Sequence, residues 1–247
     1  RSFKLYLKAR AKSLLEGSYR EADIEWLNVK NSQIDFSIGP FERYLDKILF
    51  IKRVFQAHVG IVDKEKTNLA EKIKETLYSS AKINPGKYHS TNIPKKGVQV
   101  LVEYTPATSG YISEVIFSGE HFPCDLDIME QYGSKILIYE SQLKLKFEKL
   151  HYPIFKALFE KRFASKYPKE LLYRATGWNI LLYELGRQLH KFKGARERLQ
   201  ELYGPIDEAN GFASGIQHSK HLVTKGVISQ DELEAIIIIH IAWMFSD

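Results

Sequence analysis

The stretch Val98–Tyr104, VQVLVEY, decides the fold of this chain. Valine recurs at positions 98, 100 and 102, and such alternation of β-branched residues is typical of a strand with one buried face. Two further apolar runs, Ala57–Val62 and Lys135–Tyr139 (KILIY), predict strands before and after it. The three segments together predict a sheet within the first 140 residues.

Helical periodicity surrounds these strands and fills the rest of the chain. In the first part, apolar spacing predicts helices over Phe3–Leu15, Tyr19–Leu27, Phe41–Val54 and Lys64–Ser80. Later, only helices are predicted, over Gln142–Phe163, Leu171–Phe192, Ala195–Tyr203, Ile206–Lys225 and Gln230–Phe245. We therefore predict an α+β fold, with a mixed helix and strand lobe over residues 1–140 and a mainly helical lobe over residues 141–247.

The length and the hydrophobic content of the sequence predict a globular protein with its own hydrophobic core. The sequence has 247 residues, 44% of them hydrophobic. The longest apolar run, Ala235–Phe245, contains His240 and is shorter than the ~20 residues that cross a bilayer, so no membrane span is expected. No charged and apolar leader follows Arg1, and we expect no secretory signal in this sequence. The single cysteine, Cys124, excludes an intrachain disulfide and favours a reducing, cytoplasmic compartment.

The net charge of +6, with a pI near 9.1, raises the question of an acidic partner. The densest basic group lies between Lys144 and Lys169, but Glu148, Glu160 and Glu170 are mixed into it at helical spacing. Such mixing is typical of a solvated helix face rather than of a phosphate-binding stripe. Nucleic acid is therefore not the favoured partner.

One helical segment contains the frame of a zinc-peptidase motif without its histidines. In that motif two histidines at positions i and i+4 ligate zinc from one helix face, and the glutamate after the first activates the metal-bound water. Within Leu181–Leu189 (LLYELGRQL) the corresponding positions are Tyr183, Glu184 and Arg187. The string alone is unspecific, because it occurs by chance in many helices.

Other segments give the string its context. They are Ser32–Glu42 (SQIDFSIGPFE), Gly97–Pro106 (GVQVLVEYTP), Lys146–Ile154 (KFEKLHYPI) and the acidic pair at Asp207 and Glu208. In this order they resemble the bacterial type of the dipeptidyl peptidase III family of zinc peptidases. The resemblance implies that family's two-lobed fold with a cleft. It also implies that Glu184 occupies the general-base position and Glu208 that of the third zinc ligand.

The resemblance further implies that Tyr183 and Arg187 stand where the family has its two zinc-binding histidines. A guanidinium has no free lone pair and stays protonated, so Arg187 cannot bind zinc. Because a buried carboxylate needs a partner, we expect Arg187 to contact Glu208 in place of the metal. The plain alternative is that Arg187 is a surface residue of an amphipathic helix.

The substrate-binding positions implied by the resemblance are altered too. Tyr104 and Ala107 stand where the family has the two amides of Asn-x-Pro-Asn. Asp35 keeps an acid near the family's site for a peptide amine, whereas Ser37 replaces a tyrosine. Asp35 and Tyr104 are thus the predicted peptide-binding residues. The sequence also ends before a later helical segment that the resemblance leads us to expect.

These observations lead to the hypothesis of a pseudopeptidase, a non-catalytic dipeptidyl peptidase III-like protein with a degenerate zinc site and no cofactor. Its expected partner is a peptide or protein, in a homo-oligomer, a hetero-oligomer or a larger assembly. The alternative is a metal-dependent peptidase or other hydrolase of the same family that uses zinc with Glu184, Glu208 and further ligands. A nucleic-acid binder is a weaker third class, supported by the net charge alone.

Other candidate residues point to ordinary structural roles. His218 and His221 have a spacing that can hold a metal, but no third ligand is evident near them in the sequence. His240 lies within an apolar run, as a hydrogen-bonded core histidine does. Cys124 has no neighbouring signature of a nucleophile, and no glycine pattern of a nucleotide-binding loop occurs.

Overall fold

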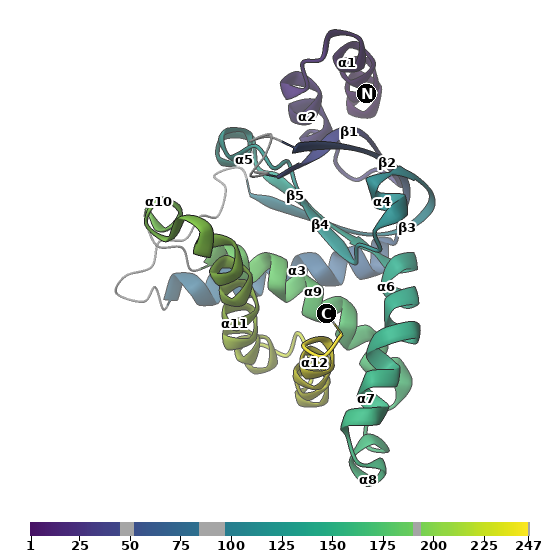
Figure 1. The fold of residues 1–247 in the computed structure, drawn as a ribbon, viewed down its shortest axis with the longest axis vertical. Coiled ribbons are helices and arrows are strands. Elements are labelled where there is room, and N and C mark those ends of the chain that lie inside the picture. The colour runs from purple at the N-terminus through teal and green to yellow at the C-terminus, as the bar shows by residue number, and fades with distance from the viewer. Residues whose placement is uncertain (45–51, 84–96, 190–193, 247) are drawn as a thin grey trace. The chain divides into compact units, whose positions relative to one another are not determined.

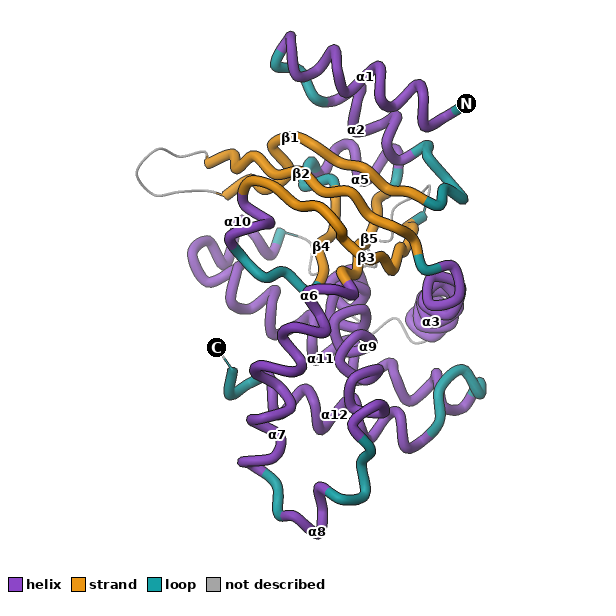
Figure 2. The backbone as a smooth tube through the Cα atoms, turned by 90° about the vertical axis from the view of Figure 1, so that its right-hand side faces the viewer, coloured by secondary structure: helices purple, strands orange, loops and turns teal. Residues whose placement is uncertain are grey.

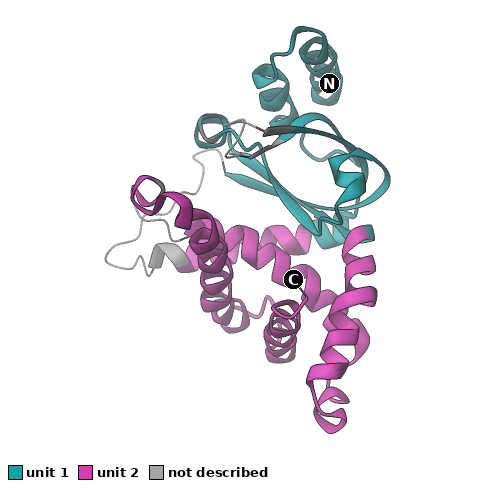
Figure 3. Cartoon of the chain, in the orientation of Figure 1, with its two compact units in different colours: residues 1–67, 94–141 teal, residues 68–93, 142–247 magenta. Residues whose placement is uncertain are grey.

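The computed structural model describes residues 1–44, 52–83, 97–189 and 194–246, and these form two compact units. The first unit comprises residues 1–67 and 94–141, and the second comprises residues 68–93 and 142–247 (Figure 3). Helix α3 (Lys64–Ile83), labelled in Figure 1, begins in the first unit and continues into the second, because the boundary falls after Thr67. Each unit is described separately below.

A five-stranded mixed sheet organises the first unit (Figure 2). The strands are β1 (Ile34–Tyr44), β2 (Lys52–Val62), β3 (Val98–Gly110), β4 (Gly119–Phe122) and β5 (Ser134–Tyr139). Their order is β1-β2-β3-β5-β4, in which β3 and β5 run parallel and the other neighbours run antiparallel. All six residues of β5 are buried, which means that both faces of the sheet are covered along this strand.

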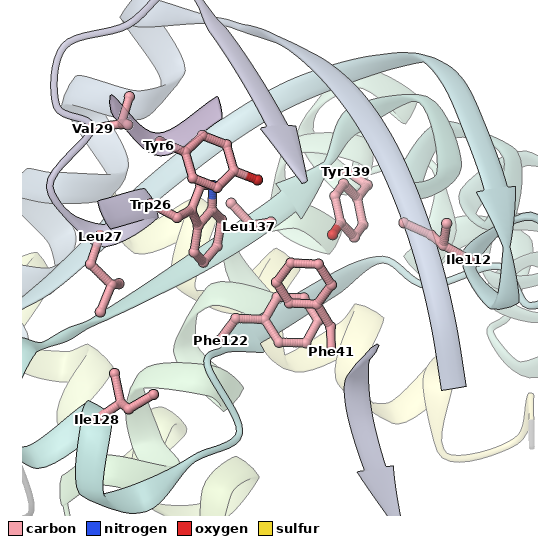
Figure 4. Close-up of a cluster of buried hydrophobic side chains, with 10 residues drawn as sticks. All are labelled: Tyr6, Trp26, Leu27, Val29, Phe41, Ile112, Phe122, Ile128, Leu137 and Tyr139. Carbon is pink, nitrogen blue, oxygen red and sulfur yellow. The ribbon is translucent and has the colours of Figure 1, made fainter. Parts of the chain in front are cut away.

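Helices of the first unit pack against the sheet through one apolar cluster. They are α1 (Ser2–Glu16), α2 (Arg20–Leu27), α4 (Tyr111–Glu114) and α5 (Leu126–Tyr132). Tyr6 of α1 and Trp26 of α2 meet Phe41 of β1 and Phe122 of β4 in the centre of this cluster (Figure 4). The rings of Phe41 and Phe122 lie 5.1 Å apart between centroids. Burying an aromatic side chain of this kind stabilises a fold by roughly 1.5–3 kcal/mol.

The second unit is helical. After the chain leaves β5, helix α6 (Glu140–Lys146), a π-helical turn (Phe147–His151) and α7 (Tyr152–Leu158) follow one another directly. The remaining helices are α8 (Lys161–Ala164), α9 (Lys169–Leu189), α10 (Ala195–Leu199), α11 (Tyr203–Thr224) and α12 (Gln230–Trp243), with a 3-10 turn at Gln200–Leu202. Helix α12 begins with a capping box, in which Ser229 and Glu232 exchange hydrogen bonds with each other's backbone amides.

Helix α9 is the centre of the second unit because it packs against both α11 and α12. Leu181, Leu185 and Leu189 of α9 are buried, as are Ile236 and Ile239 of α12. Leucines four residues apart lie on one face of a helix, and this face forms the core. None of the described helices has the length and the apolar content needed to cross a membrane.

The α+β prediction is confirmed, and the predicted strands lie within β2, β3 and β5. The helix predicted over Phe41–Val54 is wrong wherever the chain is described, and positions 45–51 lie outside the described residues. Phe41–Tyr44 continues β1, and Lys52–Val54 begins β2, with Tyr44 paired to Lys52. The apolar spacing favoured a helix, but cross-strand pairing and the burial of Phe41 in the sheet's core override that local preference.

Candidate functional site

Gly186, Gly211 and Gly215 bring α9 close to α11. This contact lies at the motif frame, which we define as Tyr183, Glu184 and Arg187. A Cβ atom added to Gly186 would lie 2.0 Å from the carbonyl oxygen of Gly211 and 2.7 Å from the amide nitrogen of Gly215. A Cβ added to Gly211 would lie 2.6 Å from Cγ of Arg187. Because the backbones approach so closely, the side chain of Arg187 crosses α11 directly beside the acidic pair in that helix.

Arg187 bonds to the acidic pair at the start of α11. Its Nη2 and Nε donate to one carboxylate oxygen of Asp207, over 3.1 Å and 3.3 Å. The same Nη2 lies 3.9 Å from Oε1 of Glu208, so the predicted contact between Arg187 and Glu208 is present as an ion pair. The hydrogen bonds, however, go to Asp207, whose second oxygen accepts from the hydroxyl of Tyr203 over 3.3 Å.

Tyr183 joins the same group one helical turn before Arg187. Its hydroxyl donates to the carboxylate of Glu208, and Nη1 of Arg187 approaches that hydroxyl to 3.4 Å. Burial, reinforced by the charge of Glu184, raises the pKa of Tyr183 above its ordinary value, so the phenol keeps its proton. Although burial alone would lower the pKa of Arg187, the charge of Glu184 and the other acidic neighbours raises it. The group therefore combines a protonated phenol with a permanent cation.

A pocket of about 570 Å³ opens beside Tyr183 and Glu208. The ring of Phe212 stacks on that of Tyr183 at 4.3 Å, and Trp243 meets Phe212 edge-on at 5.1 Å. Burial lowers the pKa of His240, so its ring is neutral near physiological pH. The lining side chains are Tyr183, Glu208, Ala209, Phe212, Ala213, Ile216, His240, Trp243 and Met244. The pocket is therefore apolar and aromatic, with a carboxylate at its edge.

The first unit contains a second polar group, which we call the sheet cluster and define as Asp35, His58 and Glu103. These residues come from β1, β2 and β3 and are buried in the sheet. Nε2 of His58 lies 2.9 Å from Oε1 of Glu103 and 3.3 Å from Oδ2 of Asp35. Nζ of Lys135, also buried, lies 3.7 Å from Oδ1 of Asp35.

Each group in the sheet cluster titrates away from its ordinary range. Burial alone would lower the pKa of His58, but the contacts with Asp35 and Glu103 raise it to about 10. Burial would raise the pKa of Asp35, whereas His58 and Lys135 bring it below its usual value. For Glu103 burial dominates, and its pKa is raised. The carboxylates of Asp35 and Glu103 therefore favour a proton or another cation at Nε2 of His58.

Comparisons with known proteins place this architecture. No protein-family model matches the chain. The structure of dipeptidyl peptidase III from Caldithrix abyssi superimposes with a TM-score of 0.85 at 22% identity, over 99% of this chain and 48% of that one. That of dipeptidyl-peptidase III from Corallococcus sp. strain EGB gives a TM-score of 0.81 at 20% identity, over 98% of this chain and 46% of that one.

The chain has a dipeptidyl peptidase III-like fold. It spans about half the length of these dipeptidyl peptidase III structures. A curated relative, Nudix hydrolase 3 of Arabidopsis thaliana, is 24% identical over 258 residues, which cover 99% of this chain and 32% of that protein. The proteins that resemble this chain thus carry different names, and the site must supply the argument for function.

The donor set at the motif frame does not fit the zinc ion that a dipeptidyl peptidase III-like fold implies. The guanidinium of Arg187 carries no lone pair, and the phenol of Tyr183 is engaged as a donor to Glu208. Two carboxylates beside a fixed cation make a poor zinc site. Among the described residues, the sheet cluster is the one group of three His, Cys, Asp or Glu side chains whose ligand atoms converge, and the motif frame does not belong to it.

The two predicted peptide-binding residues differ in their exposure to solvent. Tyr104 on β3 is 47% exposed, whereas Asp35 on β1 is buried and accepts a hydrogen bond from Nε1 of Trp26 over 3.0 Å. Their role in peptide binding stays a prediction. No sequence motif marked His58 and Glu103 as site residues, because both lie in segments predicted as plain strands.

Proposed function

We propose that this dipeptidyl peptidase III-like chain is a non-catalytic relative of the peptidases, with a degenerate zinc motif, and that it binds a peptide or a protein segment. The observation that supports the first part is the position of Arg187. Its guanidinium lies between Asp207 and Glu208, where the family resemblance puts a metal ion. A fixed charge on a side chain balances the carboxylates but activates no water.

The pocket beside Glu208 supports the second part of the proposal. Its walls are the rings of Tyr183, Phe212 and Trp243, and the carboxylate of Glu208 is exposed at its edge. Aromatic walls with an acidic edge favour a side chain with an apolar stem and a positive end, which is the chemistry of lysine or arginine. We therefore propose a segment carrying such a residue as the ligand.

A binding assay tests the ligand. We expect a fluorescein-labelled hexapeptide with a central lysine or arginine to bind more tightly than the same peptide with aspartate. Ala213 is exposed and lines the pocket, so Ala213→Trp fills the pocket and should weaken binding at least tenfold. Ala157→Trp, on the exposed side of α7, is the matched control and should leave the affinity unchanged. Equal binding by both variants would contradict the proposal.

The catalytic alternative is tested separately, by metal content and by hydrolysis of dipeptidyl-2-naphthylamides with and without added zinc. The proposal predicts no turnover that depends on Glu184. Hydrolysis that is lost in Glu184→Gln, together with zinc that is lost in Glu208→Gln, would establish a metallopeptidase of this family instead. The name of the Arabidopsis relative adds no activity to the proposal, because the match covers 32% of that protein.

A further inference from the structure

The sheet cluster has the donor geometry of a metal site. The ligand atoms of Asp35, His58 and Glu103 lie within 4.8 Å of one another, and the contacts from His58 are 2.9 Å and 3.3 Å long. Zinc–donor bonds of about 2.0–2.1 Å in a tetrahedron place neighbouring donors about 3.3 Å apart. The nitrogen already stands at about this separation from each carboxylate oxygen, and the two oxygens lie within 4.8 Å of each other.

The same atoms have no hydrogen-bond partner outside the cluster among the described residues. Within the described part of the chain, no aligned hydrogen bond reaches Nε2 of His58, Oδ2 of Asp35 or either carboxylate oxygen of Glu103. All three residues are at most 2% exposed, so bulk solvent does not reach these atoms. Leaving a buried polar atom without a partner costs about 1–3 kcal/mol. A cation between these atoms would satisfy all three residues at once.

Neighbouring side chains orient the donors in the way that partners of metal ligands do. The hydroxyl of Ser37 lies 2.8 Å from Nδ1 of His58, and when Nδ1 carries the proton, the lone pair of Nε2 faces the two carboxylates. Nε1 of Trp26 donates to Oδ1 of Asp35, which leaves Oδ2 directed to the cluster. Both contacts fix a ligand through the atom that would not touch the metal.

The sequence makes room for this arrangement at Gly60. A Cβ atom there would lie 2.2 Å from Oε2 of Glu103, so only glycine lets the carboxylate lie beside His58. A buried positive side chain close to the cluster is Lys135, whose ammonium lies 3.7 Å from Oδ1 of Asp35 and offsets one of the two carboxylate charges. When a metal ion replaces the proton on Nε2 of His58, the second carboxylate charge is left for the metal to balance.

We propose that Asp35, His58 and Glu103 bind one Zn²⁺ ion, because one imidazole and two carboxylates are suitable zinc ligands. The ion would join β1, β2 and β3, with the fourth position of a tetrahedron left to a non-protein ligand. This site is in the first unit and does not depend on the proposed peptide pocket, whose lining residues are all in the second.

Metal retention by the full chain tests the site. Metal-free protein is incubated with ZnCl₂, desalted and analysed by elemental mass spectrometry. We expect one retained Zn²⁺ per chain and a higher midpoint of thermal unfolding. Retention should fall at least tenfold in His58→Asn and Glu103→Gln but stay unchanged in Glu208→Gln and His221→Gln. Failure of the wild type to retain zinc, or loss of zinc in His221→Gln instead, would overturn the proposal.

Because substitutions in a buried cluster can prevent folding, a measurement on the wild type complements them. Nitrogen NMR of the imidazole of His58 distinguishes a metal-bound Nε2 from a protonated one. We expect saturating Zn²⁺ to convert the His58 signal to the metal-bound form. A signal that remains that of an imidazolium would show that a proton, not a metal, holds the two carboxylates together, and the proposal would be wrong.

Discussion

Replacing Arg187 by methionine removes the cation from the acidic pair while keeping most of the apolar stem. The carboxylate of Asp207 is only 8% exposed, and it would lose two hydrogen bonds from a charged donor. Breaking a fully buried pair costs about 3–5 kcal/mol, and a hydrogen bond to a charged group contributes about 1.5–3 kcal/mol. Arg187 is 32% exposed, which lets water replace part of the interaction. We therefore expect the free energy of unfolding to fall by about 2 kcal/mol.

A double-mutant cycle isolates the pair. Arg187→Met, Asp207→Asn and the double variant are unfolded with urea and followed by far-ultraviolet circular dichroism, and we expect a coupling energy of about 1–2 kcal/mol. Arg174→Met is the matched control on α9, because Arg174 is 55% exposed and lies 3.8 Å from Glu232. Its effect should stay within about 0.5 kcal/mol. A coupling energy below about 0.3 kcal/mol would refute the role given to Arg187.

Three further predictions follow from the two units. Gly186→Ala should destabilise the protein by about 3 kcal/mol in thermal unfolding, because its Cβ would meet the backbone of α11, whereas Gly204→Ala, with open space around it, should not destabilise it. The Tyr183→His/Arg187→His variant restores the two-histidine spacing and should bind one more Zn²⁺ than the wild type in isothermal titration. In metal-free protein, charged His58 contributes its full stabilisation below its ordinary pKa of about 6.5, and this stabilisation is lost as the pH rises through about 10. The midpoint of thermal unfolding should therefore fall between these two pH values, and it should fall less in His58→Gln.

Sequence patterns predicted the fold where one physical signal dominated. Val98, Val100 and Val102 alternate, and all three are buried in β3. The long helices follow their apolar spacing. In Phe41–Val54 the same spacing misled, since a strand that pairs with a neighbour can bury Phe41 as well as a helix can. Periodicity records which residues are apolar, but not which tertiary partners they find.

The candidate site was predicted in outline. The contact between Arg187 and Glu208 was expected, but the hydrogen bonds to Asp207 depend on the rotation of α11, which the glycine contacts with α9 fix. The sheet cluster was missed because His58 and Glu103 are 45 positions apart in the sequence and meet only through strand pairing. Its one local signal was Gly60, a glycine within a β-branched run.

The most direct test of the account is a crystal structure of the chain grown with Zn²⁺, with anomalous scattering measured at the zinc edge. The account predicts no anomalous peak within bonding distance of Tyr183, Glu184 or Glu208, and a guanidinium density from Arg187 against Asp207. A zinc peak bonded to Glu208, with Arg187 displaced from the acidic pair, would contradict it.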